Sequence, residues 1–494
     1  MTANLETAGE GFSGSTDDWA ARRWWGLAAL ALAQFMVFLD ETVVNVALPS
    51  IKADLGFSQA TLSWVVSAYI VVFGGLVLLG GRIADLFGRR RVVLIGTAVF
   101  GVASLFDGLA PTQGFLLGAR VLQGVGAALA TPAALAMVTE LFPVRSERVK
   151  ALAIWGALSG LGFAIGLLLG GALTQAASWR WVFLINVPVA LASLWVVPRL
   201  VPRSRCCKAS SFDLGGATTV TAGVTLLVYT LVKAPAYGWM SPTVLVLFTV
   251  ALGLIGAFVL IERRSSAPLL PGGFVHRRTV LVPNVLQILL GVTAISTLFL
   301  LTLYTQQVLG YSPLKSGLAY LPLAGGVAIA TAIAKQIIGR LGPRPLAVAG
   351  LAIAAIGMTR LGHASIAMSY WDGLLPALAV LGFGAGLSFV SITTAALERV
   401  DEDAAGLASG LLSTAVQIGG ALGVAVLGGV VVTQRSSGLV ATGSTRVAAE
   451  LGGLKLAFLI AAAIAQLASV VAAVGLRWAE AKNKEEVVTV SVSS

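Results

Sequence analysis

Two adjacent acids, Asp40 and Glu41, lie inside a long apolar stretch that begins near residue 24. A charge in the middle of a bilayer costs about 2.5–3.5 kcal/mol on insertion scales, so an acid kept there usually has a use. Apolar surroundings favour the neutral form of a carboxyl, which lets it bind and release a proton near physiological pH. The pair is therefore a candidate for proton coupling.

The two acids need not do the same job, because neighbouring residues point about 100° apart on a helix. Glu41 shares one helical stripe with Gln34, Phe38, Asn45 and Leu48, which is an unusually polar face for a helix in lipid. This spacing predicts that Glu41 makes a cavity polar or binds a cationic substrate, with Gln34, Phe38 and Asn45 beside it. In the alternative, one acid is structural and pairs with a buried polar group.

A third charge, Arg120, stands near the start of another apolar stretch, without an acid beside it in sequence. One interpretation has its flexible stem carry the charge out to the membrane interface. The other places it in a cavity wall, where a fixed positive charge favours the ionised form of a facing carboxyl and helps to expel a proton.

The composition of the chain decides what surrounds these charges. Hydrophobic residues make up 57% of the chain and charged residues 11%, and the mean hydropathy is +0.91. A soluble protein carries about 25% charged residues, so this supply could not cover a water-facing surface. The apolar runs are continuous, whereas the strands of a membrane barrel would alternate. We predict an all-α integral membrane protein.

About fourteen stretches are long and apolar enough to cross a bilayer as helices. We place them at 24–48, 62–82, 92–109, 115–138, 151–174, 179–198, 214–233, 243–261, 280–305, 316–337, 345–362, 372–396, 405–433 and 455–476. They define a tail at 1–23, a six-helix half at 24–198, a two-helix insertion at 199–262, a second six-helix half at 263–476 and a tail at 477–494. We expect the longest water-exposed stretch near 434–454, and disorder beyond Glu480.

An internal repeat supports the two halves. The pairs share one offset, since 310 − 56, 312 − 58, 342 − 88 and 344 − 90 all equal 254, and they are Gly56/Gly310, Ser58/Ser312, Gly88/Gly342 and Arg90/Arg344. Parallel repeats of this kind are one way in which transporters build two halves around a central site. The repeat leaves the seventh and eighth spans as an extra pair.

The net charge of +11 indicates topology rather than a nucleic-acid partner. Lys and Arg gather in alternate loops, as at Arg89–Arg91, which the positive-inside rule assigns to the cytoplasm. Both termini are then expected on the cytoplasmic side of a bacterial inner membrane, with lipid around the helices.

The sequence also argues against several function classes. The adjacent Cys206 and Cys207 form no disulfide framework, and we interpret them as incidental loop residues rather than a metal or redox sensor. His276 and His363 are far apart, which disfavours a zinc site. The sequence holds no Gly-Lys dipeptide and hence no Walker A loop. We therefore expect no metal, no cofactor and no enzyme, with a proton gradient as the energy source.

Several segments carry a family resemblance. Gly81–Arg91 follows the second span, Leu117–Ala128 lies in the fourth, and Leu39–Pro49 closes the first. Together they resemble the signatures of the major facilitator superfamily. With fourteen spans, and with Ser178–Pro188 and Tyr304–Gln307, the chain is similar to the drug:proton antiporter branch that has two additional helices.

The resemblance implies roles for individual residues. It assigns Asp40 to proton coupling and places Arg120 in the cavity wall. It makes Asp85 and Arg89 a cytoplasmic latch; a plain basic loop is the alternative. Glycines at the ends of the spans would let the backbones approach. The latch residues are Gly81, Asp85, Gly88, Arg89 and Arg90. From the second half, Tyr304, Gln306 and Gln307 are either substrate-binding counterparts or ordinary helix-end residues.

The fifth span departs from the family pattern. The motif's first glycine is Ala153 and its proline is Leu167, so the proline-linked bend is expected to be lost. A stripe of small residues remains for close helix packing, at Gly162, Gly166, Gly170 and Gly171.

We therefore expect a monomeric exporter that exchanges hydrophobic or cationic drugs for protons by alternating access. The missing proline keeps proton-coupled solute uptake open as an alternative, because that motif marks exporters within the superfamily. A membrane receptor or scaffold that transports nothing is a third possibility.

Overall fold

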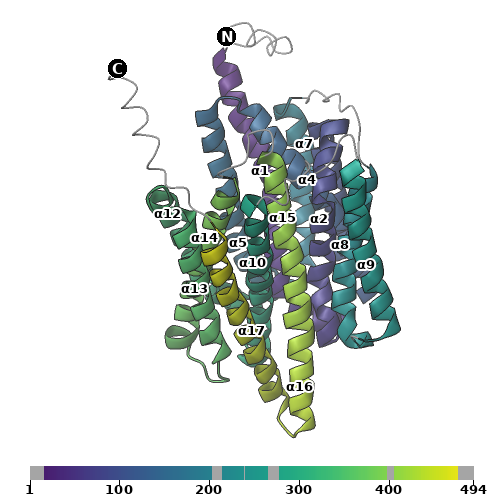
Figure 1. Ribbon diagram of the computed structural model, residues 1–494, viewed down its shortest axis with the longest axis vertical. Helices are drawn as coiled ribbons and strands as arrows, with labels where there is room; N and C mark the ends of the chain where they lie inside the picture. The colour runs from purple at the N-terminus through teal and green to yellow at the C-terminus, as the bar shows by residue number, and fades with distance from the viewer. Residues whose placement is uncertain (1–15, 203–213, 239, 265–277, 398–404, 477–494) are drawn as a thin grey trace.

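Helices alone make up the regular structure of the computed structural model, which describes residues 16–202, 214–238, 240–264, 278–397 and 405–476. Figure 1 shows the long helices side by side in one bundle. The predicted all-α class is confirmed. Cys206, Cys207, His276 and the tail after Glu480 lie outside the described residues.

The helices can be grouped by the predicted division of the chain, which itself stays a prediction. The first half contains α1 (Thr16–Leu55), α2 (Gln59–Phe87), α3 (Arg89–Gly108), α4 (Gln113–Leu141), α5 (Arg145–Ala176), α6 (Trp181–Leu184) and α7 (Asn186–Leu200). The insertion contains α8 (Leu214–Tyr237) and α9 (Pro242–Arg264). The second half contains α10 (Arg278–Leu303), η2 (Tyr304–Val308), α11 (Pro313–Ala319), α12 (Leu321–Leu341), α13 (Pro343–Gly362), η3 (Tyr370–Leu374), α14 (Leu375–Leu397), α15 (Ala405–Gly423), η5 (Val424–Val431), α16 (Val432–Ala441) and α17 (Arg446–Gly475).

Each predicted span falls on one helix or on consecutive helices. Within the described ranges, 11 helices are long and apolar enough to cross a membrane, and 12 if α2, bent by 52°, counts as one span. Shorter apolar stretches lie in α5 and α8. The exact number of fourteen spans stays a prediction.

The stretch 434–454 is helical except for a turn at 442–445, and most of its residues up to 448 are exposed, so that its place in water stays a prediction. α15, η5 and α16 run on without a break to Ala441, and α17 begins at Arg446. Figure 1 shows this pair reaching beyond the other helices at the bottom of the bundle. Polarity marks where a helix leaves the membrane, not where the helix ends.

The paired repeat positions adopt the same local conformation. Gly56 and Gly310 have φ of 71° and 66°, and Gly88 and Gly342 have φ of 93° and 77°, a region that glycine enters without a steric penalty. Ser58 and Ser312 both cap the following helix, and each hydroxyl accepts a hydrogen bond from the backbone N–H three residues later. The repeat therefore specifies turns as well as spans.

The two-helix insertion lies beside the first half, although it separates the halves in sequence. Figure 1 shows α8 and α9 at one edge of the bundle, next to α2. The Thr221 hydroxyl donates to the Gly75 carbonyl at 2.7 Å, and the rings of Trp64 and Tyr229 lie 5.7 Å apart.

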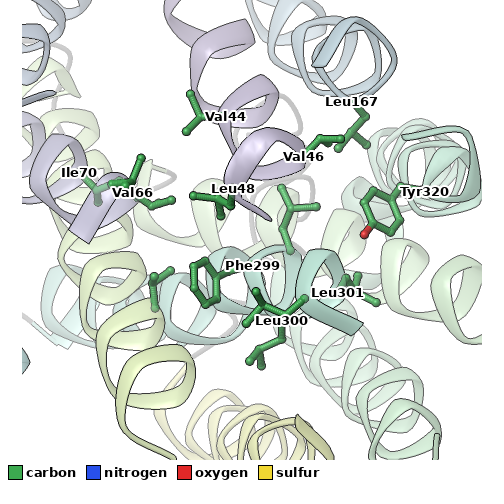
Figure 2. Packing of buried hydrophobic residues seen from close by; sticks show 14 of the residues in the cluster. Val44, Val46, Leu48, Val66, Ile70, Leu167, Phe299, Leu300, Leu301 and Tyr320 are labelled. Carbon is green, nitrogen blue, oxygen red and sulfur yellow. The ribbon is translucent and has the colours of Figure 1, made fainter. Parts of the chain in front are cut away.

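The halves meet toward the end of the bundle that lies away from Thr16. Figure 2 shows side chains of α1, α2 and α5 converging with side chains of α10, among them Val46, Leu48, Phe299 and Leu301. At this end Gly171 of α5 also packs against the Pro313 carbonyl of α11. Two further clusters, around Val138 and around Leu351, are each built from one half alone.

The glycine stripe of α5 packs against α1, as predicted. A Cβ added at Gly162 would lie 2.8 Å from Phe38 Cβ, and one at Gly170 would lie 2.7 Å from the Val43 carbonyl oxygen. Contact this close leaves no room for a side chain between the two helices. α5 itself runs unbroken past Leu167.

We expect Gly170→Ala to lower the free energy of unfolding by about 1–3 kcal/mol, because the new methyl group overpacks a backbone contact that no rotamer change can relieve. Thermal unfolding of the purified protein in detergent measures the effect. Gly118→Ala is the matched control, since nothing lies within 4 Å of a Cβ added there. Equal midpoints for both variants would contradict the packing argument.

Candidate functional site

Asp40 is fully buried and lies at the centre of a polar cluster inside the first half. Its Oδ2 accepts a hydrogen bond from Arg120 Nη1 at 2.7 Å. Its Oδ1 accepts from Gln123 Nε2 at 2.9 Å and from Asn186 Nδ2 at 2.8 Å. Three donors from α4 and α7 therefore hold one carboxylate of α1, as a buried charge requires.

Arg120 faces this interior, so the interpretation that it reaches the membrane interface was wrong. The side chain is 1% exposed, and its Nε donates to the Val65 carbonyl of α2 at 2.9 Å. The guanidinium also contacts Gln123 Oε1 and lies 4.5 Å from the centroid of the Tyr69 ring. These bonds and the cation–π contact fix the charge opposite Asp40.

Part of this cluster was not predicted from the sequence. Gln123 and Asn186 stand in the quoted motifs but received no role. Ser104 of α3 carried no sequence signal; its Oγ contacts Gln123 Nε2 at 2.8 Å and Asn186 Nδ2 at 3.4 Å. Asp107, also in α3, is fully buried, and neither of its carboxyl oxygens has a hydrogen-bond partner. An acid in the last turn of the third span was the signal that could have found it.

Glu41 points away from this cluster, toward the second half. Its Oε1 accepts a hydrogen bond at 2.8 Å from Nε2 of Gln417, a residue of α15 that was not predicted. The expected divergence of the two acids is confirmed, because Asp40 is enclosed by the first half while half-buried Glu41 bonds across to the other half. The two acids thus meet different surroundings.

The other residues of the Glu41 stripe have mixed surroundings. Gln34 is buried, and neither atom of its amide has a hydrogen-bond partner. Asn45 donates to the Glu41 carbonyl at 2.8 Å, within its own helix. Phe38 is half-buried and packs against Gly162, and Leu48 belongs to the apolar contact between the halves. Gln34, with its whole amide, and Asn45, with its Oδ1, therefore have polar atoms left to bind another molecule.

The three candidate substrate-binding residues from the second half have different contacts. Gln306 donates to the Val46 carbonyl at 2.8 Å and so joins the halves. Tyr304 is fully buried, and its hydroxyl donates to the Ser365 carbonyl at 2.8 Å within the second half. This contact favours the alternative that Tyr304 is an ordinary helix-end residue. Gln307 is half-buried. Among the described residues, Gln306 is the one of the three that hydrogen-bonds to α1.

The latch residues form bonds within the first half. Arg89 donates to Asp85 Oδ1 at 3.0 and 3.1 Å and to Glu140 at 3.4 Å, and Arg90 donates to the Pro198 carbonyl at 2.8 Å. Gly88 is required by its positive φ. The expected close approach at Gly81 was wrong, since a Cβ there would sit 3.6 Å from Pro132, an ordinary contact. The role of a conformational gate stays a prediction.

Among the described residues, no group of three His, Cys, Asp or Glu side chains is placed to hold a metal ion. His363 contacts the Thr359 carbonyl of its own helix at 2.9 Å.

Comparison with known proteins gives consistent matches over most of the chain. The model of the Major Facilitator Superfamily matches residues 30–424. The chain is 44% identical over 450 residues to a puromycin resistance protein of Streptomyces alboniger, covering 90% of this chain and 88% of that protein. It is 38% identical over 405 residues to a cephamycin export protein of Amycolatopsis lactamdurans, covering 81% and 83%.

Solved structures match in fold. A bacterial homologue of the human lysosomal transporter Spinster, solved inward-facing and unoccupied, aligns with a TM-score of 0.66 at 19% identity, covering 95% of this chain and all of that one. The transporter PepTSo aligns with a TM-score of 0.67 at 16% identity, covering 92% and 97%.

Proposed function

Because this chain belongs to the major facilitator superfamily of multi-pass membrane transporters, we propose that it exports antibiotics or other hydrophobic and amphipathic molecules in exchange for protons. The observation that carries the proposal is the buried ion pair of Asp40 and Arg120, one residue away from Glu41, which bonds across to the other half. Export is supported by relatives that are resistance and export proteins.

Proton coupling follows from the surroundings of Asp40. Protonation of this carboxyl would cancel its charge and leave Arg120 without its ionic partner, so the proton and the ion pair exclude one another. In the proposed cycle, substrate entering from the cytoplasm favours release of the proton from Asp40. Rocking of the halves then exposes the site outward, where protonation of Asp40 releases the cargo.

Glu41 is the residue that we expect to bind a cationic substrate. Its carboxylate has one bond, to Gln417, and a cationic group could replace that amide as its partner. Gln34 adds an unpaired amide on the same stripe, and Phe38 adds an aromatic face. A few polar groups on a mostly apolar wall give loose specificity for lipophilic cations.

We infer that this conformation is inward-facing. The halves contact one another through Gln306 and Val46 and through Gly171 and Pro313, toward the end opposite Thr16. With both termini in the cytoplasm of a bacterium, as the distribution of Lys and Arg favours, that closed end faces outward. We place the protein in the inner membrane, as a monomer surrounded by lipid.

Drug susceptibility in a host that lacks its own pumps tests the proposal. Expression should raise the inhibitory concentration of puromycin or of other compounds in a panel of antibiotics. In inside-out vesicles, an imposed pH gradient should drive drug into the lumen, and adding drug should dissipate the gradient. Movement in the opposite direction would instead establish proton-coupled uptake, and no movement with any compound would leave a receptor or scaffold.

We expect Glu41→Gln to weaken transport of lipophilic cations by about tenfold, because a hydrogen bond to a charged partner contributes about 1.5–3 kcal/mol. Neutral compounds should be much less affected. Initial rates of uptake into inside-out vesicles, measured for one cation and one neutral drug, give the comparison. An equal loss for both compounds would assign Glu41 a structural role.

A further inference from the structure

The carboxyl of Asp107 is buried without a partner at the edge of the Asp40 cluster. It occupies the last turn of α3, is 0% exposed, and neither oxygen accepts or donates a hydrogen bond. Ser104, one helical turn earlier, contacts both Gln123 and Asn186, the amides that hold Asp40. The unpartnered acid is therefore adjacent to the site that we assign to proton coupling.

The charged groups around Asp107 can be traced element by element. Arg120 of α4 is the charge that acts on it most strongly, and Asp40 of α1 acts on it in the opposite sense. Tyr69 of α2 stacks on Arg120, and Arg180 donates to the Ala110 carbonyl just beyond the end of α3 at 3.3 Å. Since the guanidinium bonds to Asp40 and Asp107 has no partner, Arg120 pairs with one of the two acids in this conformation.

An ionised carboxylate at this position would be poorly tolerated. Buried charges persist when donors surround them, and Asp107 has none, whereas the oxygens of Asp40 have three donors. The neutral, protonated carboxyl is the form that this environment accommodates. An apolar side chain could fill the same space without the cost of desolvating an acid.

We propose that Asp107 is a second proton-binding site, protonated in this conformation, which exchanges with Asp40 as the ionic partner of Arg120. When Asp40 takes up a proton, Asp107 gives up its own and becomes the carboxylate that faces the guanidinium. Two carboxyls then share one proton and one fixed positive charge, so the net charge of the buried cluster is the same in both states. The role in transport rests on the proposed function, but the protonation itself does not.

Asp107 also lies on the outer side of Asp40. It stands one residue from the end of α3, and Arg120 follows in the second turn of α4, so both lie near the end at which the halves are closed. A proton passing from Asp107 to Asp40 would therefore move inward. Release of one proton by Asp40 and uptake of one from the outside by Asp107 then restore the starting state.

Infrared difference spectroscopy tests the exchange on the full-length protein in lipid vesicles, without any substrate. The Glu41→Gln background removes the other carboxyl nearby, and the carbonyl stretch of a protonated carboxyl is followed as pH is raised. We expect this band in the Glu41→Gln protein, which is the parent for the other variants. We expect the band to be lost when Asp107→Asn is added. We also expect its loss in Asp40→Asn, where Asp107 is intact but must ionise to pair with Arg120.

Two results would overturn the inference. A parent protein without the band has an ionised Asp107, and a band that persists in Asp40→Asn belongs to an acid that does not exchange. In vesicles, Asp107→Asn should also lower drug-driven proton movement by about a hundredfold, the low end of what a positioned proton donor contributes, while Asp107→Glu retains much of it. Should the parent itself move no drug, the proposed export fails, but the spectroscopic result stands on its own.

Discussion

Arg120→Met should lower the free energy of unfolding by about 3–5 kcal/mol, the usual cost of removing one partner from a buried ion pair. Asp40 would remain without exposure to water and with only two amide donors, so it must either stay charged at great cost or take up a proton. Thermal unfolding in detergent at neutral pH measures the loss. At acidic pH the variant should recover stability, because a protonated Asp40 needs no counter-ion.

The double variant Arg120→Met/Asp40→Asn separates charge from packing. Without either charge, the apolar thioether stem fills the space beside Tyr69, and much of the stability should return. Transport should not return with it. A single Arg120→Met variant that unfolds at the temperature of the unmodified protein would contradict the assignment of a buried pair.

Asp40→Asn should abolish exchange of drug for protons while leaving the protein folded. The amide keeps the shape of the carboxyl, and its one oxygen can accept a bond from either Arg120 or Gln123, but it cannot bind a proton near neutral pH. We expect the exchange rate in inside-out vesicles to fall by at least about a hundredfold. Binding of drug to the purified variant should weaken, because the neutral amide resembles the protonated Asp40 that releases the cargo in the proposed cycle.

Ser104→Ala is a suitable control, since it removes one hydroxyl from the cluster but no ionisable group. It should retain most of the exchange rate. If the variant with amides at both 40 and 41 still moved drug against its gradient at the normal rate, the protons would have to travel elsewhere in the molecule.

The helical fold could be predicted from sequence because it depends on local properties. Continuous apolar runs require helices in lipid, and Gly88 and Gly342 mark turns that only glycine forms easily. The extent of α16 was missed because a helix that projects into water looks like a loop on a hydropathy scale. Tertiary contact, not local polarity, keeps those residues helical.

The site could be predicted only in part. Asp40 and Glu41 stood out because any acid in an apolar run does, and helix geometry separated their directions. Their partners could not be read from spacing, because Asn186 and Gln417 lie 146 and 376 residues from the acids that they contact. Polar residues such as Ser104 are common in membrane helices, so nothing local distinguishes the one that completes the cluster.

The glycine contact between α1 and α5 has a mechanical consequence. With backbone against backbone at Gly170 and Val43, the two helices cannot slide past each other and must move as one stiff lever. This rigid pair of helices carries Asp40, Glu41 and the Val46 carbonyl. Glu41 bonds to the opposite half, and the Val46 carbonyl accepts from Gln306. Opening the outer side therefore strains the hydrogen bond between Glu41 and Gln417 and the hydrogen bond from Gln306 to Val46 at the same time. Neither bond can break while the other stays intact.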